Sequence, residues 1–302
     1  MPHLEKSMDK ADKELKISYR QKNTTVCPVC SYEFHREEMF SGGGRLIAGR
    51  LTDELRRLYE VSKKYGKIYP LSFVVTVCPS CYYAAFPKDF EALGPGEVEK
   101  INGLTAARKN AMKKFFGGLD FNADRDLKTG AASYMLAVDC YTYRNKKVAP
   151  TFKIAISSIR AAWLFGDLAK EEPDSHFGKI SAFFYKKAFQ SYVKLLDIMQ
   201  TGAEPVDAVG HMGPDTDKNW GYEGVLYLTA VLTVKVGAKE ADPVKRLEYF
   251  EKCKRYLSRL FGSGKTSKSK PSELLDKTRD LYDKINQMID EWNKESASST
   301  PE

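Results

Sequence analysis

Four cysteines occur as two CxxC pairs, and this spacing is typical of a metal-binding turn. The first pair is Cys27 and Cys30, the second is Cys78 and Cys81, and 47 residues separate Cys30 from Cys78. Two residues between cysteines allow one tight turn to present both sulfurs to one ion, and Zn²⁺ accepts four thiolates arranged as a tetrahedron. The sequence therefore predicts one zinc ion per chain. Because four cysteines close the coordination shell, we expect a structural metal rather than a catalytic one.

Two histidines raise alternatives to this assignment. His35 follows the first pair and is an alternative ligand, although with four cysteines available a surface position is the simpler interpretation. His211 shares a long loop with Asp207, Asp215 and Asp217, which could form a metal or catalytic site. Asp, Gly and Pro are also the usual residues of exposed connections, and we favour that interpretation.

Arginines gather around the glycine-rich loop Ser41–Gly44. They are Arg45, Arg50, Arg56 and Arg57. Loop amides and guanidinium groups together suit an anion, a nucleic acid or another partner. The alternative is that Asp53 and Glu54 neutralise these arginines on a solvated helix.

Local patterns predict the elements that position the cysteines. Thr24–Val26 reads as a short strand that enters the first pair, and alternation at Tyr32 and Phe34 predicts a strand that leaves it. The β-branched run Phe73–Val77 predicts a strand that enters the second pair. Thr52–Tyr59 has a capping residue and apolar spacing that predict a helix. The sequence therefore predicts a zinc-ribbon-like module with a glycine-rich loop and a helix inserted between its two cysteine pairs.

Helical periodicity dominates from about residue 91 onward. The predicted helices are Glu97–Phe116, Thr129–Arg144, Pro150–Phe165, His176–Gln200, Trp220–Val236, Pro243–Leu260 and Ser272–Trp292. The pair 227–237 and 242–253 is similar to a tetratricopeptide repeat, with Cys253 where that repeat has a small residue and Arg246 departing from the pattern. We expect a helical-hairpin array that resembles such repeats.

The whole chain is thus expected to be mainly α-helical, with a few short β-strands near its N-terminus. The expected organisation is a charged flexible arm at 1–22, the zinc-ribbon-like module at 23–90, the helical array at 91–293 and a disordered tail at 294–302.

The two cysteine pairs and their flanks resemble a bacterial family known as domain of unknown function 2225. The matching segments are Cys27–Cys30 with Phe34, Pro70–Phe73, Val77–Cys81, Tyr83–Phe86, Arg160–Leu164 and Tyr227–Leu228. The resemblance covers roughly residues 24–260. It implies a zinc-knuckle module fused to tetratricopeptide-like helices, and it implies no activity. Tyr82 stands where such turns commonly carry glycine, so we expect it to adopt a left-handed backbone conformation.

Composition limits the environment of the protein. No run of 18 or more apolar residues is present, so no transmembrane helix is indicated, and the charged N-terminus does not resemble a secretory signal. Six cysteines, four of them with metal spacing, fit a reducing compartment. These features favour a cytoplasmic protein.

No catalytic motif emerges from the sequence, so the favoured function is a non-enzymatic scaffold or adaptor whose helical array binds a protein or peptide. The net charge of +8, the loop arginines and the basic stretch 254–270 leave nucleic-acid binding as one alternative. An enzyme with a site between the module and the helices is the other alternative. The sequence does not predict an oligomeric state.

Overall fold

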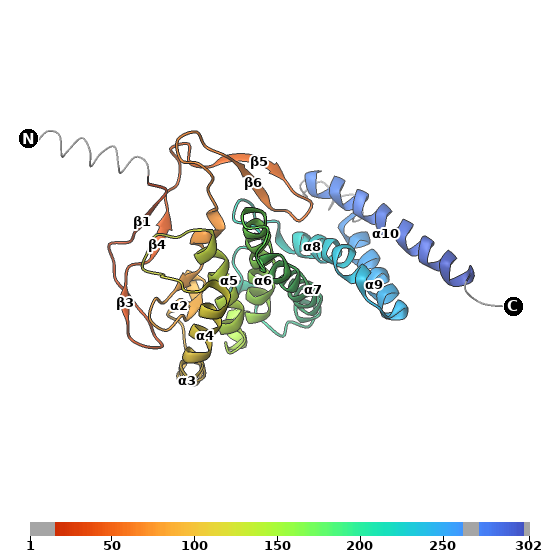
Figure 1. The fold of residues 1–302 in the computed structure, drawn as a ribbon. Coiled ribbons are helices and arrows are strands. Elements are labelled where there is room, and N and C mark those ends of the chain that lie inside the picture. Colours follow the sequence, from red (N-terminus) through yellow and green to blue (C-terminus); the bar gives the residue numbers. More distant parts are fainter. Residues whose placement is uncertain (1–15, 262–271, 299–302) are drawn as a thin grey trace, which may run out of the picture.

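The computed structural model describes residues 16–261 and 272–298. Short strand pairs and turns form its N-terminal part, and helices form the rest, in agreement with the predicted mainly α-helical class (Figure 1). The strands are β1 (Ser18–Arg20), β2 (Thr25–Val26), β3 (Glu33–Phe34), β4 (Glu37–Met39), β5 (Ile47–Leu51), β6 (Arg57–Glu60), β7 (Thr76–Val77) and β8 (Ala84–Ala85). The helices are α2 (Pro87–Phe90), α3 (Pro95–Gly103), α4 (Thr105–Phe116), α5 (Leu127–Tyr141), α6 (Pro150–Glu171), α7 (Phe177–Thr201), α8 (Gly221–Lys235), α9 (Pro243–Phe261) and α10 (Ser272–Ser298), with 3-10 turns η1 (Pro70–Phe73), η2 (Lys146–Val148), η3 (Val206–Ala208) and η4 (Gly237–Lys239).

The strands form four separate antiparallel pairs, and two of these pairs carry the cysteines. β2 pairs with β3 and β7 pairs with β8, and each pair is a hairpin whose turn is one CxxC segment. A two-residue strand gains little from its own hydrogen bonds. These hairpins are therefore held mainly by their packing, and we refer to residues 16–90 as the cysteine module.

The last residues of the predicted flexible arm form a strand, β1, that pairs with β4. β1 pairs with β4 in register from Ser18 and Met39 to Arg20 and Glu37. The Ser18 hydroxyl donates to Glu37, whose side chain is 2% exposed and also forms an ion pair with Arg20 at 3.3 Å. The expectation of a flexible arm is thus wrong for residues 18–20, and residues 1–15 of that arm lie outside the described residues.

The predicted helix at Thr52–Tyr59 is a β-hairpin in the structure. β5 and β6 pair from Ile47 and Glu60 to Leu51 and Arg57 with one irregularity, and Thr52 to Arg56 form the turn. The Thr52 hydroxyl accepts from the amide of Arg56 at 3.1 Å, so it supports this turn and does not begin a helix. The local pattern failed because Leu55, at φ 58° and 0% exposed, inserts among distant helices.

The predicted strand Phe73–Val77 is shorter than expected. Pro70 begins the 3-10 turn η1, and only Thr76–Val77 remains as strand β7. Ser72 of this turn approaches Gly130 of α5 so closely that a Cβ atom on Gly130 would collide with the Ser72 side chain. The close approach explains both the glycine and the turn, because a straight strand would carry Ser72 away from α5.

Consecutive helices pack against one another from α5 to α10, and Figure 1 shows this succession running away from the cysteine module. The helix predicted at Pro150–Phe165 continues past Gly166 as α6 to Glu171. The missing side chain of Gly166 allows α7 to approach, since a Cβ atom there would already touch the Ser181 hydroxyl at 3.4 Å. The predicted helix Glu97–Phe116 is divided into α3 and α4 at Gly103 and Leu104.

The last helices pack closely as the repeat-like pattern anticipated, although this packing does not by itself define a tetratricopeptide repeat. Cys253 of α9 is 2% exposed, and its thiol donates to the Thr233 hydroxyl of α8 at 3.0 Å. The guanidinium group of Arg246 lies over the Trp292 ring of α10, 4.6 Å from its centroid. α10 reaches Ser298, so the predicted disordered tail is wrong for residues 294–298, and residues 299–302 lie outside the described residues.

Candidate metal centre

The two CxxC turns share one backbone geometry. In the first, the amide of Ser31 donates to the Cys27 carbonyl at 2.9 Å, and in the second the amide of Tyr82 donates to the Cys78 carbonyl at 3.0 Å. Ser31 and Tyr82 both adopt left-handed conformations, with φ of 59° and 58°. The conformation expected at Tyr82 is therefore present. Its hydroxyl donates to the Leu119 carbonyl at 2.9 Å, a contact that helps to hold this unfavourable backbone conformation.

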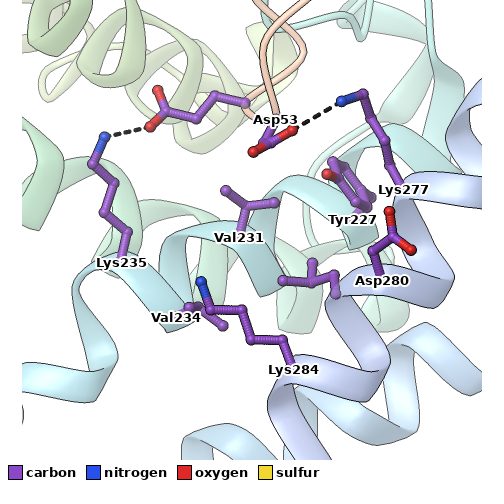
Figure 2. A pocket seen from close by; sticks show the side chains of 10 residues that line it. Asp53, Tyr227, Val231, Val234, Lys235, Lys277, Asp280 and Lys284 are labelled. Carbon is purple, nitrogen blue, oxygen red and sulfur yellow. Dashed lines mark hydrogen bonds and ion pairs between the residues drawn. The ribbon is translucent and has the colours of Figure 1, made fainter.

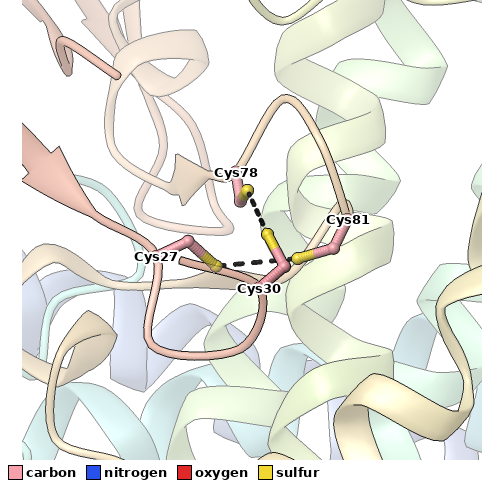
Figure 3. Close-up of side chains that lie close together, drawn as sticks. All are labelled: Cys27, Cys30, Cys78 and Cys81. Atoms are coloured by element: carbon pink, nitrogen blue, oxygen red, sulfur yellow. Dashed lines mark hydrogen bonds between the residues drawn. The ribbon is translucent and has the colours of Figure 1, made fainter. Parts of the chain in front are cut away.

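The four thiol sulfurs converge on one point, as Figure 3 shows. All four lie within 4.8 Å of one another, and the pairs Cys27–Cys81 and Cys30–Cys78 are 3.6 Å apart. Four sulfurs around a zinc ion at about 2.3 Å would be separated by roughly 3.8 Å at the edges of the tetrahedron. The cluster therefore has nearly the size that a tetrahedral metal site requires, and the cysteines present fit such an ion.

The surroundings favour the charged form of one of these thiols. The pKa of Cys78 is lowered, first by hydrogen bonds with the Cys27 and Cys81 thiols and then by the backbone N–H groups of Cys81 and Ser80. By contrast, burial raises the pKa of Cys140 to about 12, and it stays a packing thiol that accepts from the amide of Ala84. Backbone N–H donors at a thiolate are a common feature of metal-binding turns because they offset its negative charge.

Burial fixes the second turn more firmly than the first. Cys78 is 0% and Cys81 is 2% exposed, whereas Cys30 is partly exposed. The buried guanidinium of Arg108 on α4 donates to the carbonyls of Cys81 and Ile101, which ties this turn to α3 and α4. The cluster is thus seated against the helices on one side and accessible near Cys30 on the other.

His35 lies away from this cluster. Its Nδ1 atom is 2.9 Å from the Gln21 carbonyl, and the residue is exposed. The structure therefore places it at the surface, where the simpler sequence interpretation had put it.

The four candidate arginines make separate contacts. Arg56 pairs with Asp167 of α6, and Arg57 pairs with Asp217 at 3.0 Å. The Arg45 guanidinium lies between the Phe40 and Tyr65 rings, 4.8 and 4.9 Å from their centroids. Arg50 is exposed near the hairpin tip, where the pKa of Asp53 is lowered mainly by its hydrogen bond with Lys277 and to a smaller extent by the charge of Arg50. The structure thus gives two of these arginines carboxylate partners from distant parts of the chain.

The loop with His211 anchors the hairpin. The Asp215 carboxylate is buried and accepts from the backbone amide of Arg57 at 2.9 Å, and the carbonyls of Pro214 and Asp215 accept from the Arg160 guanidinium. His211 Nδ1 accepts from the backbone amide of Gly213 at 3.2 Å. Asp215 and Asp217 are thus structural partners of Arg57, whereas Asp207 is exposed in η3.

Sequence reasoning missed the residues that receive the hairpin tip. The Glu54 carboxylate accepts from the Trp163 ring nitrogen, from the Tyr185 hydroxyl at 2.9 Å and from Lys235. Asp53 pairs with Lys277 of α10 at 2.9 Å, and Figure 2 shows this pair at the edge of a cavity of about 450 Å³. No local signal could reveal these contacts, because each joins segments more than a hundred residues apart.

The combination of a four-cysteine cluster in short hairpins with a helical array defines the chain as a mainly helical protein with a candidate metal centre. The chain belongs to the family described as uncharacterised proteins conserved in bacteria (DUF2225), whose model matches residues 20–285. It is 44% identical over 270 residues to an uncharacterised protein of Borreliella burgdorferi, a match that covers 89% of this chain and 96% of the relative. No solved structure gives a significant match. Among the described residues, no helix has both the length and the apolarity needed to cross a membrane.

Proposed function

We propose that this protein is a non-enzymatic adaptor, in which a structural zinc ion stabilises the cysteine module and the tetratricopeptide-like helical array binds a protein or peptide. One observation carries the proposal. The larger hollow, of about 690 Å³, opens between α7, α8 and α9, a second of about 450 Å³ opens between the β5–β6 hairpin tip, α8 and α10, and no cysteine of the cluster lines either of them. Volumes of this size suit the side chains of a bound segment. Recognition is therefore assigned to the helices, and stabilisation to the metal.

The paired arginines favour a protein partner over a nucleic acid. Phosphate binding needs cations that are free to exchange their counterions. Arg56 and Arg57 are 14% and 23% exposed and are already neutralised by Asp167 and Asp217. The basic stretch 254–270 offers further charge, but residues 262–270 of it lie outside the described residues.

The partner class is tested by photo-crosslinking in a bacterium that encodes the chain. Benzoylphenylalanine replaces Phe183, which is 62% exposed on α7, or Tyr32, which is 40% exposed in the cysteine module. Adducts with protein should form from position 183 and should be scarce from position 32. Adducts with nucleic acid alone, or equal protein adducts from both positions, would contradict the proposal.

The metal is tested by elemental analysis of purified protein. We expect one zinc ion per chain, because closed four-thiolate sites are characteristic of structural zinc. The variant Cys78→Ser should lose the ion, since it removes one of the four sulfurs. The matched variant Cys253→Ser, which alters a buried thiol of α9 outside the cluster, should retain it. Iron in place of zinc would show that the identity of the metal is wrong, because iron also accepts this ligand set.

We also place the protein in the cytoplasm. All six cysteines are free thiols in the structure, and four of them converge at one site. A reducing compartment preserves such thiols for metal binding, whereas an oxidising one would pair them as disulfides. Cell fractionation that recovers the protein with the periplasm or culture medium would overturn this assignment.

A further inference from the structure

The larger hollow of the array has an apolar floor. It lies between α7 and the turn from α8 to α9, encloses about 690 Å³, and is called here the α7–α9 groove. The rings of Phe189 and Tyr249 meet edge to face at its floor, with centroids 5.2 Å apart. Gly237 makes the arrangement possible, because a Cβ atom there would lie 3.1 Å from the Phe189 ring. Ala182 and Val236 complete an apolar surface that a side chain could cover.

The rim of the groove is strongly basic. Its charged residues are Lys186, Lys235, Lys239, Lys245 and Glu240. Lys235 is paired with Glu54, and Lys245 lies 3.6 Å from Glu240. Lys186 and Lys239 are exposed and form no ion pair with any residue that the structure describes. Two uncompensated ammonium groups beside an apolar floor attract carboxylates.

The N-terminus of α9 does not contribute to this charge. The Asp242 carboxylate accepts from the amides of Val244 and Lys245, at 3.0 and 3.3 Å, and so occupies the donors that an external anion would use. The attraction for acids therefore rests on lysine side chains alone.

We propose that the α7–α9 groove binds an acidic peptide segment, with an apolar side chain of the peptide against Phe189 and Tyr249 and its carboxylates at Lys186 and Lys239. The proposal rests on the adaptor function and names the site and the partner class. Gln190, exposed at the rim, offers both an amide donor and an acceptor to the peptide backbone. Peptide grooves commonly combine such an apolar pocket with charged groups at its edge.

The aromatic residues do not suit a single-stranded nucleic acid. Base stacking requires an exposed ring face. Phe189 is only 6% exposed, and the face of Tyr185 is covered by the Lys235 ammonium group, 3.8 Å from the ring centroid. A peptide side chain can enter such a recess, whereas neither Phe189 nor Tyr185 offers a base an open ring face to stack on.

The test measures binding of three fluorescent ten-residue peptides to the full chain by anisotropy. One peptide combines Asp and Glu with Leu and Phe, the second replaces Leu and Phe with Ser, and the third replaces the acids with Lys. We expect the first peptide to bind, the second to bind at least tenfold more weakly, and the third not to bind. Affinity for the first should also fall as salt is raised, because its contacts include exposed charges.

Variants locate the site. The double variant Lys186→Glu with Lys239→Glu should weaken binding of the first peptide at least tenfold. Its matched control, Lys147→Glu with Lys194→Glu, changes the net charge equally at exposed lysines that do not line the groove and should have little effect. Ala182→Trp should block the floor without altering charge, and circular dichroism checks that each variant is folded.

Three results would overturn the proposal: no binding of the first peptide by the unaltered chain, equal binding of all three peptides, or equal effects of the groove and control variants. The crosslinking experiment separates this failure from failure of the adaptor function. Protein adducts at position 183 that persist in the Lys186→Glu and Lys239→Glu variant would leave the adaptor function standing and reject this site. Adducts with nucleic acid alone would reject the adaptor function itself.

Discussion

At the scale of the residue, the carboxylate of Glu54 joins three helices to the hairpin tip. It accepts from Trp163 of α6, Tyr185 of α7 and Lys235 of α8. Its side chain is 14% exposed, whereas that of neighbouring Asp53 is 86% exposed. Hydrogen bonds to a shielded carboxylate contribute more than those of an exposed ion pair, because water competes less for the partners.

The variant Glu54→Ala should therefore destabilise the protein by about 2–3 kcal/mol, since it leaves the buried Trp163 ring nitrogen and the half-buried Tyr185 hydroxyl without this acceptor. The matched variant Asp53→Ala removes only an exposed pair with Lys277 and should cost less than about 1 kcal/mol. Urea unfolding of both variants measures the difference. Equal losses would show that the three contacts of Glu54 contribute no more than a surface ion pair.

Asp139 provides a prediction about pH. Burial raises the pKa of this carboxyl above its ordinary value of 3.8, although Arg108 opposes the shift, and its Oδ2 atom is buried without a hydrogen-bond partner. A carboxyl with a higher pKa when folded binds its proton more tightly in that state. Its contribution to stability is therefore present below the unfolded pKa and is lost as pH rises through the folded pKa.

The variant Asp139→Asn should accordingly raise the free energy of unfolding at pH 7, where the native chain carries the buried charge. Below the unfolded pKa, at about pH 3, the carboxyl is protonated in both states and the two proteins should differ little. Thermal unfolding across this range compares them. An identical difference at both pH values would show that packing, and not ionisation, distinguishes the two side chains.

At the scale of the element, the β5–β6 hairpin links the cysteine module to the helical array. Figure 1 shows it extending from the module across the helices towards α10. Leu55 at its tip is 0% exposed and lies beside Gly224 of α8. A Cβ atom built on Gly224 would be 3.9 Å from the Leu55 side chain. Two strands alone form a marginally stable hairpin in water, so its position depends on this contact and on Glu54.

The variant Leu55→Ala should destabilise the protein by about 2–4 kcal/mol, because it removes buried methyl groups and leaves a cavity. Val61 follows the same hairpin and is 65% exposed, so Val61→Ala is the matched control and should cost less than about 0.5 kcal/mol. Chemical denaturation measures both changes. Limited proteolysis should also cut the hairpin faster in the Leu55 variant, and unchanged cleavage would contradict its role in docking.

At the scale of the whole molecule, the four-cysteine cluster and the helices share one hydrophobic core. Tyr83 beside the second CxxC turn is 0% exposed, and its hydroxyl accepts from Arg144, which also donates to the carbonyls of Asp89 and Ala92. Lys153 of α6 forms a buried ion pair with Asp89 at 3.1 Å. Separating the two partners of a buried ion pair leaves each charge without its partner, which costs free energy. The module and α6 are therefore expected to unfold together.

Removing the proposed zinc ion should therefore lower the melting temperature of the whole chain in a single transition. A chelator deprives the folded state of its bound ion and so lowers its stability relative to the unfolded chain. Calorimetry, with hydrogen exchange of α5 and α6, measures the effect. A separate early transition confined to residues 16–90 would show that the module and array unfold independently, and an unchanged melting temperature would show that the metal has no structural role.

Features that depend on neighbouring residues could be predicted from the sequence. The CxxC spacing identified the four cysteines that converge, because two intervening residues restrict each pair to one turn. Periodicity identified most long helices of the array, because they bury an apolar face, whereas α8 is buried on all sides from Gly224 to Thr233. Those signals are local, and tertiary contacts preserved them.

The conformation of Thr52–Tyr59, the role of Gly166 and the partners of Arg56 and Arg57 depend on tertiary contacts. Thr52–Tyr59 has helical spacing, but burial of Leu55 and the contacts of Glu54 hold it as a hairpin. Gly166 could end a helix, yet here it allows α7 to approach α6. Arg56 and Arg57 meet Asp167 and Asp217, partners more than a hundred residues away in the chain. In each case the conformation is stabilised by burial or ion pairing against segments that are distant in the sequence, and local patterns do not report such contacts.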